Sequence, residues 1–128
     1  MDRVVHFEIP AENLERAKKF YSENFGWKLN QLGPEVGNYV LVHTGPTDAE
    51  GMPQDRAFIN GGLMPRDPSA SSPLLVIAVA DADRAVEQVT KSGGRLVGEI
   101  LDIPNVGRYA RVEDTEGNVI AVIKPTMR

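Results

Sequence analysis

Hydrophobic and polar residues alternate near the start of the chain, across Val4–Ile9. Alternation with a period of two is typical of a β-strand that has one buried face. Phe7 and Ile9 share the apolar face, so His6 and Glu8 point to the opposite side. We therefore predict a strand whose Phe7 and Ile9 pack against a helix.

The period then changes to that of a helix. Pro10 is expected to end the first strand, and apolar residues recur at helical spacing from about Glu12 to Asn24. Gly26 supplies the left-handed conformation that commonly ends a helix. Further strands are expected at Trp27–Leu32, Asn38–His43 and Ala57–Met64, with a loop at Gly45–Gln54.

A segment rich in proline and serine, Pro65–Pro73, predicts a linker in the middle of the chain. It is followed by a continuous apolar strand, Leu74–Val79, and by Asp81, a residue type that caps helix N-termini. The pair Gly93-Gly94 is expected to close the second helix. Strands are then predicted at Arg95–Ile100, Arg108–Glu113 and Val119–Ile123, with a hairpin turn at Asp114–Asn118.

Both halves carry the same order of elements, strand-helix-strand-strand-strand. Leu14-Glu15-Arg16-Ala17 matches Ala82-Asp83-Arg84-Ala85 at an offset of 68 positions, and the same offset pairs Gly26 with Gly94. Such a repeat indicates two copies of one supersecondary unit. We predict one α+β domain over residues 1–128, with a βαβββ module at about 1–64, the linker at about 65–73 and a second module at about 74–128.

Composition narrows the classes of function. A chain of 128 residues fits one domain that can fold without a metal or a disulfide. The net charge of −4 provides no overall basic footprint for nucleic acid, and the absence of cysteine excludes thiolate nucleophiles and Cys-type zinc sites. The sequence shows neither a signal-peptide pattern nor an apolar run of membrane-spanning length. We therefore expect a cytoplasmic protein with no nucleic-acid and no membrane partner.

Five short motifs follow one another along the chain. They are His6-Phe7-Glu8-Ile9-Pro10, Leu14-Glu15-Arg16-Ala17-Lys18-Lys19-Phe20-Tyr21, Phe25-Gly26-Trp27, Asn60-Gly61-Gly62-Leu63 and Asp114-Thr115-Glu116-Gly117-Asn118. In their order and spacing they resemble the glyoxalase, bleomycin-resistance and extradiol-dioxygenase superfamily, also called the vicinal oxygen chelate superfamily. The resemblance covers nearly the whole chain and is greatest for the branch related to lactoylglutathione lyase.

This resemblance implies curved mixed sheets around a cleft, often in a homodimer. It also implies a divalent metal held by His, Gln or Glu at four positions, on the first and last strands of each module. His6 matches the first of these positions, whereas the others fall at Leu74, at Ala121 and near Gly61, which offer no ligand. Because a lone imidazole holds a metal poorly, we expect a degenerate metal site and no cofactor, with a divalent metal as the alternative.

His6 and Glu8 are the candidate catalytic residues. On a strand they lie on one face, about 6–7 Å apart. An imidazole suits acid–base work at neutral pH, so the pair could remove a proton beside a carbonyl. The alternatives are a histidine that contacts a ligand or neighbour without chemistry and a carboxylate in an ion pair. A metal site made of His6, His43 and Glu8 would depart from the pattern of the superfamily.

Five further residues are candidates for substrate binding. Tyr39 and His43 are in phase on one strand, and both line the cleft if that face is concave. Asn60 lies next to a superfamily ligand position. Tyr109 and Arg111 share a face of a later strand, where the guanidinium could bind an anionic group or form a surface salt bridge.

The glycine pair Gly61-Gly62 has two interpretations. Without side chains, it could allow a ligand or the backbone of a partner to approach closely. It could equally mark a β-bulge that curves the sheet.

Three hypotheses for function remain open. The preferred one is a small-molecule-binding protein, because Leu74, Val76, Ala78 and Ala121 make one wall of the expected cleft apolar. The second is an enzyme, either a metal-dependent lyase or isomerase similar to lactoylglutathione lyase or an acid–base enzyme that uses His6 and Glu8. The third is an interaction domain with a vestigial cleft. Whether the protein is catalytic is left open.

Overall fold

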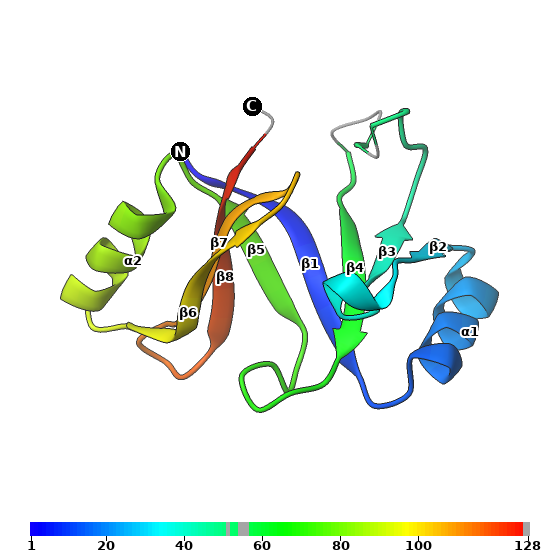
Figure 1. The fold of residues 1–128 in the computed structure, drawn as a ribbon, viewed down its shortest axis with the longest axis horizontal. Helices are drawn as coiled ribbons and strands as arrows, with labels where there is room; N and C mark the ends of the chain where they lie inside the picture. The colour runs from blue at the N-terminus through cyan, green and yellow to red at the C-terminus, as the bar shows by residue number, and fades with distance from the viewer. Residues whose placement is uncertain (51, 54–56, 127–128) are drawn as a thin grey trace. The chain divides into compact units, whose positions relative to one another are not determined.

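The computed structural model describes residues 1–50, 52–53 and 57–126 (Figure 1). The chain forms two compact units. One is His6–Pro73, and the other comprises the chain from Leu74 onward together with the first five residues. The elements follow the order β-α-β-β-β twice, with a short 3₁₀ helix in the first half, which confirms the predicted α+β fold of two βαβββ modules.

The unit His6–Pro73 contains a mixed sheet and one α-helix. The sheet has the order β2-β3-β4-β1, in which β1 and β4 are parallel and the other neighbours are antiparallel. Its elements are β1 (Arg3–Ala11, of which the part from His6 onward belongs to this unit), α1 (Leu14–Phe25), β2 (Lys28–Gln31), the 3₁₀ helix η1 (Pro34–Val36), β3 (Val40–His43) and β4 (Asn60–Pro65).

Local chemistry explains both ends of α1. The Asn13 side chain accepts a hydrogen bond from the backbone N–H of Arg16 at 2.9 Å, so the helix begins two residues later than expected. Gly26 has a φ of 69° and its N–H bonds to the Ser22 carbonyl, which ends the helix as predicted.

Pro10 does not end β1, contrary to the sequence-based expectation. The strand continues to Ala11, and Pro10 pairs with Met64 of β4. Proline fixes φ near −65°, which an extended strand tolerates, and costs the ladder only one N–H donor.

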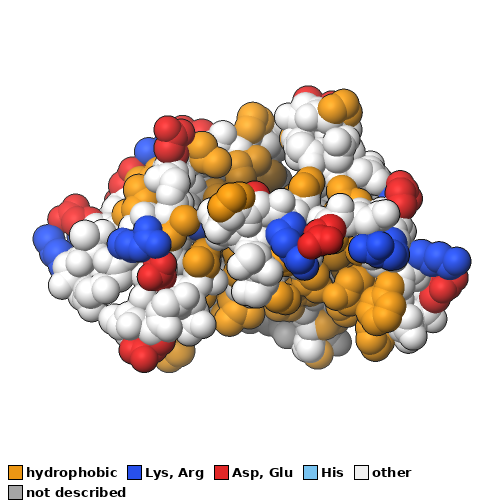
Figure 2. All heavy atoms as spheres, turned by 90° about the horizontal axis from the view of Figure 1, so that it is seen from below, with side chains coloured by type: hydrophobic (Ala, Val, Ile, Leu, Met, Phe, Trp, Pro, Cys, Tyr) orange, Lys and Arg blue, Asp and Glu red, His pale blue; other side chains and the backbone are white. Residues whose placement is uncertain are grey.

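The core of this unit lies between its sheet and α1. Val40, Val42 and Leu63 are fully buried there, and Phe7 and Ile9 pack against them as predicted. An aromatic cluster extends this core, with Trp27 stacked on Tyr21 at a centroid distance of 5.2 Å. The cluster reaches the surface at Phe20 and Phe25, which are more than half exposed. Figure 2 shows one face of the molecule, on which hydrophobic side chains reach the surface beside charged ones.

The second unit repeats the architecture with the strand order β5-β8-β7-β6, in which β5 and β8 are parallel. Asp81 caps the helix by accepting from the Arg84 N–H at 3.0 Å, as predicted. Its elements are β5 (Leu74–Ala78), α2 (Ala82–Lys91), β6 (Arg95–Ile103), β7 (Gly107–Glu113) and β8 (Val119–Pro125). Across the described residues, the helices are too short or too polar to span a bilayer.

Strand β6 extends three residues beyond its predicted end at Ile100. Its pairing with β7 shifts between Val97 and Leu101, and Gly98 lies there with a φ of 78°. A bulge of this kind adds residues to one strand without ending the pairing, which the sequence pattern alone did not indicate.

The predicted hairpin turn joins β7 to β8. Asp114 accepts hydrogen bonds from the N–H groups of Glu116 and Asn118, and these bonds hold the pKa of its carboxyl below the ordinary value. Of the loop predicted at Gly45–Gln54, residues 51 and 54 lie outside the described part of the chain. In its described part, Thr47 pairs with Pro53.

Candidate functional site

Two hydrogen bonds join three polar side chains within the unit His6–Pro73. The Tyr39 hydroxyl donates to the Glu8 carboxylate, with 3.0 Å between Oη and Oε2. The same hydroxyl lies 2.9 Å from Nε2 of His6. Tyr39 is therefore the central member of a His6–Tyr39–Glu8 network.

Strand alternation places the network on the sheet face that is turned away from α1. Phe7 and Ile9 of β1 pack in the α1 core, so His6 and Glu8 point to the other side. Tyr39 directly precedes β3, whose first residue, Val40, is also in that core. His6 and Glu8 belong to β1 and Tyr39 adjoins β3, and these two strands are not neighbours, since β4 lies between them.

Strand β4 makes room for the network with a glycine. Gly62 pairs with Glu8 on one side and with Leu41 on the other. A Cβ atom at position 62 would collide with the hydroxyl and ring of Tyr39. The phenol therefore occupies the space that a side chain at this position would need.

Gly61 serves the opposite face of the same strand. A Cβ atom there would collide with the Phe7 ring, which belongs to the α1 core. The pairing of β4 with β1 runs without a shift through both glycines, so they do not form a bulge. In the structure, the glycine pair accommodates two aromatic rings of its own unit, an arrangement that the two sequence-based interpretations did not include.

Burial sets the electrostatics of the network. Glu8 is only 6% exposed, and its carboxylate is held in this low-water environment by hydrogen bonding. Burial lowers the pKa of His6 below its ordinary value of 6.5, because desolvation disfavours the imidazolium, while the nearby Glu8 acts in the opposite direction. The imidazole is therefore neutral at neutral pH and has one nitrogen available as a base.

Asn60 and His43 lie beside the network but have different surroundings. Asn60 pairs with His6 in the β1–β4 ladder and is buried. Its amide oxygen accepts from the Thr44 N–H at 3.0 Å, and its amide nitrogen lies 3.3 Å from the Thr47 hydroxyl. Asn60 thus anchors the chain that leaves β3. His43 is the last residue of β3 and is half-buried.

The other two candidates for substrate binding belong to the second unit. Tyr109 and Arg111 lie on β7, on the face opposite α2, since Ala110 and Val112 are in the α2 core. The Arg111 Nε donates to the Tyr109 hydroxyl at 3.0 Å, and the guanidinium carbon lies 5.9 Å from the ring centroid. This contact holds the planar guanidinium fork against an aromatic ring.

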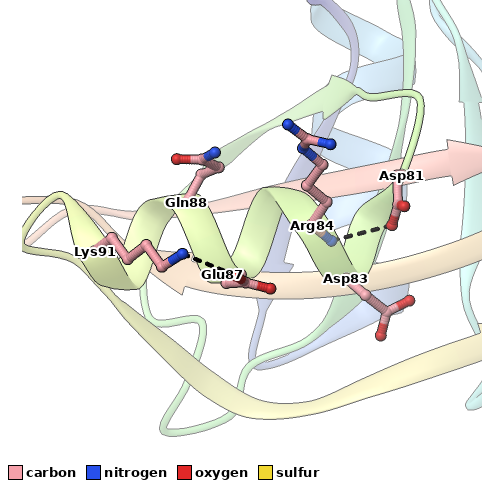
Figure 3. Close-up of a pocket in the computed structure, with 6 residues that line it drawn as sticks. All are labelled: Asp81, Asp83, Arg84, Glu87, Gln88 and Lys91. Carbon is pink, nitrogen blue, oxygen red and sulfur yellow. Dashed lines mark hydrogen bonds and ion pairs between the residues drawn. The ribbon is translucent and has the colours of Figure 1, made fainter.

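A surface hollow of about 400 Å³ lies along α2 in the second unit (Figure 3). Its polar groups are engaged locally: Asp81 caps the helix, Lys91 pairs with Glu87 at 2.9 Å, and Asp83 pairs with Arg108 at 2.7 Å. The residues that line the hollow come from one helix and its cap. Binding sites usually bring together polar groups from several elements, which this hollow does not do.

The strand register tests whether the residues fit a superfamily metal site. Val76 pairs with Ala121 in β5–β8, and the 68-residue offset relates Val76 to Glu8, which pairs with Gly62. The counterpart of Ala121 by register is therefore Gly62, which is adjacent to Gly61, the residue near which the sequence had placed this position. Neither Ala121 nor Gly62 has a side chain that could bind a metal.

The remaining metal positions fit no better. Leu74 has no donor, and Nε2 of His6 is engaged by Tyr39. Over residues 1–50, 52–53 and 57–126, no group of three His, Asp or Glu side chains gathers to hold an ion. The residues present do not fit a metal of the superfamily type, and we derive no chemistry through one.

The fold and the network define a duplicated βαβββ protein with a polar sheet face in its first unit. The family model of the glyoxalase/bleomycin resistance protein/dioxygenase superfamily matches residues 3–122. The chain belongs to this superfamily, as its sequence motifs suggested.

Two curated proteins illustrate the relationship in sequence. A glyoxylase-like domain-containing protein of Didymella fabae is 33% identical over 118 residues, which cover 90% of this chain and 88% of that protein. A Mycobacterium bovis protein provisionally named glyoxylase CFP32 is 30% identical over 120 residues. That match covers 92% of this chain but only 42% of the mycobacterial protein.

Solved structures share the fold at low sequence identity. The methylmalonyl-CoA epimerase of Streptomyces coelicolor, in its S115T form with 2-nitronate-propionyl-CoA, superposes with a TM-score of 0.67 and 15% identity. The superposition covers 98% of this chain and 95% of the epimerase. At this identity the likeness shows a shared fold and no more.

Proposed function

We propose that this protein binds a small organic molecule on the sheet face of the unit His6–Pro73 that carries His6, Tyr39 and Glu8. The observation that carries the proposal is the hydrogen-bonded network itself. It groups an imidazole, a phenol and a buried carboxylate on a face that is not covered by α1. A few polar groups on an otherwise apolar surface are the usual anchors of a small-molecule site.

Ligand-induced stabilisation tests this proposal. A ligand that binds only the folded protein raises its stability by about 2.7 kcal/mol when present at 100 times its Kd. We would measure Tm with a panel of acyl-CoA thioesters, short carboxylic acids and aromatic compounds. The thioesters are included because a structural neighbour was solved with a CoA derivative.

Variants make this test specific to the network. We expect the Tm shift to be lost in Glu8→Gln and Tyr39→Phe and retained in Tyr21→Phe, a matched loss of a phenol that stacks on Trp27 instead. Binding constants from calorimetry would follow the same order. No shift with any panel compound, or an equal shift in all variants, would contradict the proposal.

A second candidate function is proton abstraction from a carbon next to a carbonyl. It is favoured by the neutral His6 and by its connection through Tyr39 to the Glu8 carboxylate. We would incubate each bound ligand with the protein in D₂O and follow deuterium incorporation by NMR. Incorporation that His6→Ala abolishes supports an acid–base enzyme, whereas binding without incorporation supports a non-catalytic binding protein.

The homodimer and the cytoplasmic location expected from the sequence also remain proposals. Light scattering of the purified protein tests the first, and fractionation of cells that produce it tests the second.

A further inference from the structure

We propose that Tyr39 is a positioning residue that holds His6 in the Nε2–H tautomer, so that Nδ1 is the basic atom of the site. The tautomer is a property of the ligand-free protein. Only its use on a ligand rests on the proposed function.

The argument starts from the number of hydrogens in the network. A carboxylate has no hydrogen to donate, so the bond between Tyr39 and Glu8 uses the single hydrogen of the phenol. The 2.9 Å contact between the phenol oxygen and Nε2 of His6 then needs a hydrogen on the nitrogen. A neutral imidazole has only one N–H, so Nδ1 carries the lone pair.

The opposite arrangement is unfavourable. If Tyr39 donated to His6, its oxygen would face the Glu8 carboxylate with no hydrogen between two acceptors. Two acceptor oxygens that face each other without a hydrogen repel each other, and Glu8 is buried, where little water is present to screen that repulsion. The hydrogen therefore stays between Tyr39 and Glu8.

The surrounding structure fixes the phenol in this position. Gly62 leaves the space that the ring and hydroxyl occupy, and Leu41, two residues after Tyr39, is held in the β3–β4 ladder. Tyr39 is thus anchored by the sheet next to it, and a side chain at position 62 would displace it. This dependence provides a second way to break the network without removing the hydroxyl.

The arrangement gives a proton a defined route. When Nδ1 takes a proton from a ligand carbon, a C–H bond breaks, an N–H bond forms and the electron pair stays on the ligand as an enolate. The Nε2 proton can then pass to the Tyr39 oxygen while the Tyr39 proton passes to Glu8 Oε2. The products are a neutral imidazole and a protonated Glu8, so charge and atoms balance.

Nitrogen NMR of the histidine rings tests the proposal directly. The protein has two histidines, so His43→Gln leaves only the His6 signals. At a pH above 7 we expect a protonated Nε2, an unprotonated Nδ1, and an Nε2–H hydrogen that exchanges slowly with water. A wild-type His6 that carries its hydrogen on Nδ1 would overturn the proposal, whatever the variants do.

Two variants and two matched controls separate positioning from general packing. Tyr39→Phe removes the hydroxyl, and Gly62→Ala pushes it away. Both are expected to speed exchange of the Nε2 hydrogen at least tenfold and to raise the Nδ1–H population. Tyr21→Phe and Gly61→Ala, which disturb the α1 core instead, are expected to leave both readouts unchanged. Equal readouts in Tyr39→Phe and wild type would also overturn the proposal.

The result is independent of ligand binding. A fixed tautomer with no ligand in the panel would overturn the proposed function and leave Tyr39 as a positioning residue. A ligand that binds a protein with the Nδ1–H tautomer would overturn this inference and leave the proposed function.

Discussion

The two units have the same strand register but opposite chemistry on the sheet face turned away from the helix. In the first unit, Glu8 of β1 pairs with Gly62 of β4. In the second unit, the corresponding pair is Val76 of β5 and Ala121 of β8. A carboxylate beside a glycine has thus been exchanged for two apolar residues without a change in pairing.

Burial makes this difference informative. Glu8 is 6% exposed and Val76 is 2% exposed, so both positions are largely shielded from solvent. A buried carboxylate needs hydrogen-bond donors, of which the Tyr39 hydroxyl is one, whereas valine needs none. The comparison shows that the βαβββ backbone tolerates either set of residues.

The largest effect is expected when a carboxylate is placed in the apolar unit. In the first unit, the Tyr39 hydroxyl donates to the carboxylate at the corresponding position, Glu8. Val76→Glu buries a charge in the second unit, where Val76 pairs with Ala121, whose side chain has no donor. We expect the free energy of unfolding to fall by about 3–5 kcal/mol, measured by urea denaturation. The control Val76→Ile, which adds one methylene, is expected to cost about 1–3 kcal/mol at most. A Val76→Glu protein no less stable than this control would show that the two faces are interchangeable.

A smaller effect, equal for the two helices, is expected at their N-caps, where the two units are alike. Asn13 and Asp81 cap α1 and α2 through the same bond, at 2.9 and 3.0 Å. Replacement of either by alanine is expected to cost about 1 kcal/mol of unfolding free energy, whereas serine should restore most of it. Chemical denaturation of the four variants checks this. A loss confined to one helix would mean that the caps are not equivalent.

The last prediction concerns the pH dependence that only the first unit should show. Burial lowers the pKa of folded His6, while the unfolded chain keeps an ordinary value near 6.5. Below that pH the unfolded state binds more protons than the folded state, so stability falls as the pH drops from about 6.5 towards the folded pKa. Above it, His6 contributes no such dependence.

The change in Tm between pH 7.5 and pH 5.5 measures this effect. We expect wild type to lose more stability over this interval than His6→Gln, in which the buried titrating group is absent. His43→Gln serves as the control and should behave like wild type. The idea fails if His6→Gln and wild type respond equally to acid.

Much of the fold could be predicted from local patterns. The cap at Asp81, the left-handed Gly26 and the turn at Asp114 act over a few residues, so neighbouring residues determine them. Alternation also assigned Phe7 and Ile9 to the helix-facing side correctly. The errors came where pairing overrides local preference, as in the continuation of β1 through Pro10.

The candidate site was predicted only in part. The sequence paired His6 with Glu8 and gave Tyr39 as a separate candidate for substrate binding, but it gave no sign that the Tyr39 hydroxyl joins the other two residues. Tyr39 is 31 positions from Glu8 and 33 from His6, and their meeting depends on which strand separates β1 from β3. The available signal was Gly62, whose missing side chain reflects the position of the Tyr39 ring.

By itself, the amino-acid order determined the duplicated helices and strands, the cap at Asp81 and the side of the first strand that faces a helix, because these follow from interactions within a few residues. Only the tertiary structure decided that Tyr39 lies between an imidazole and a buried carboxylate and that β4 has no side chain in its way. Such contacts depend on strand order and register, which are set by packing across the whole unit and not by local preference.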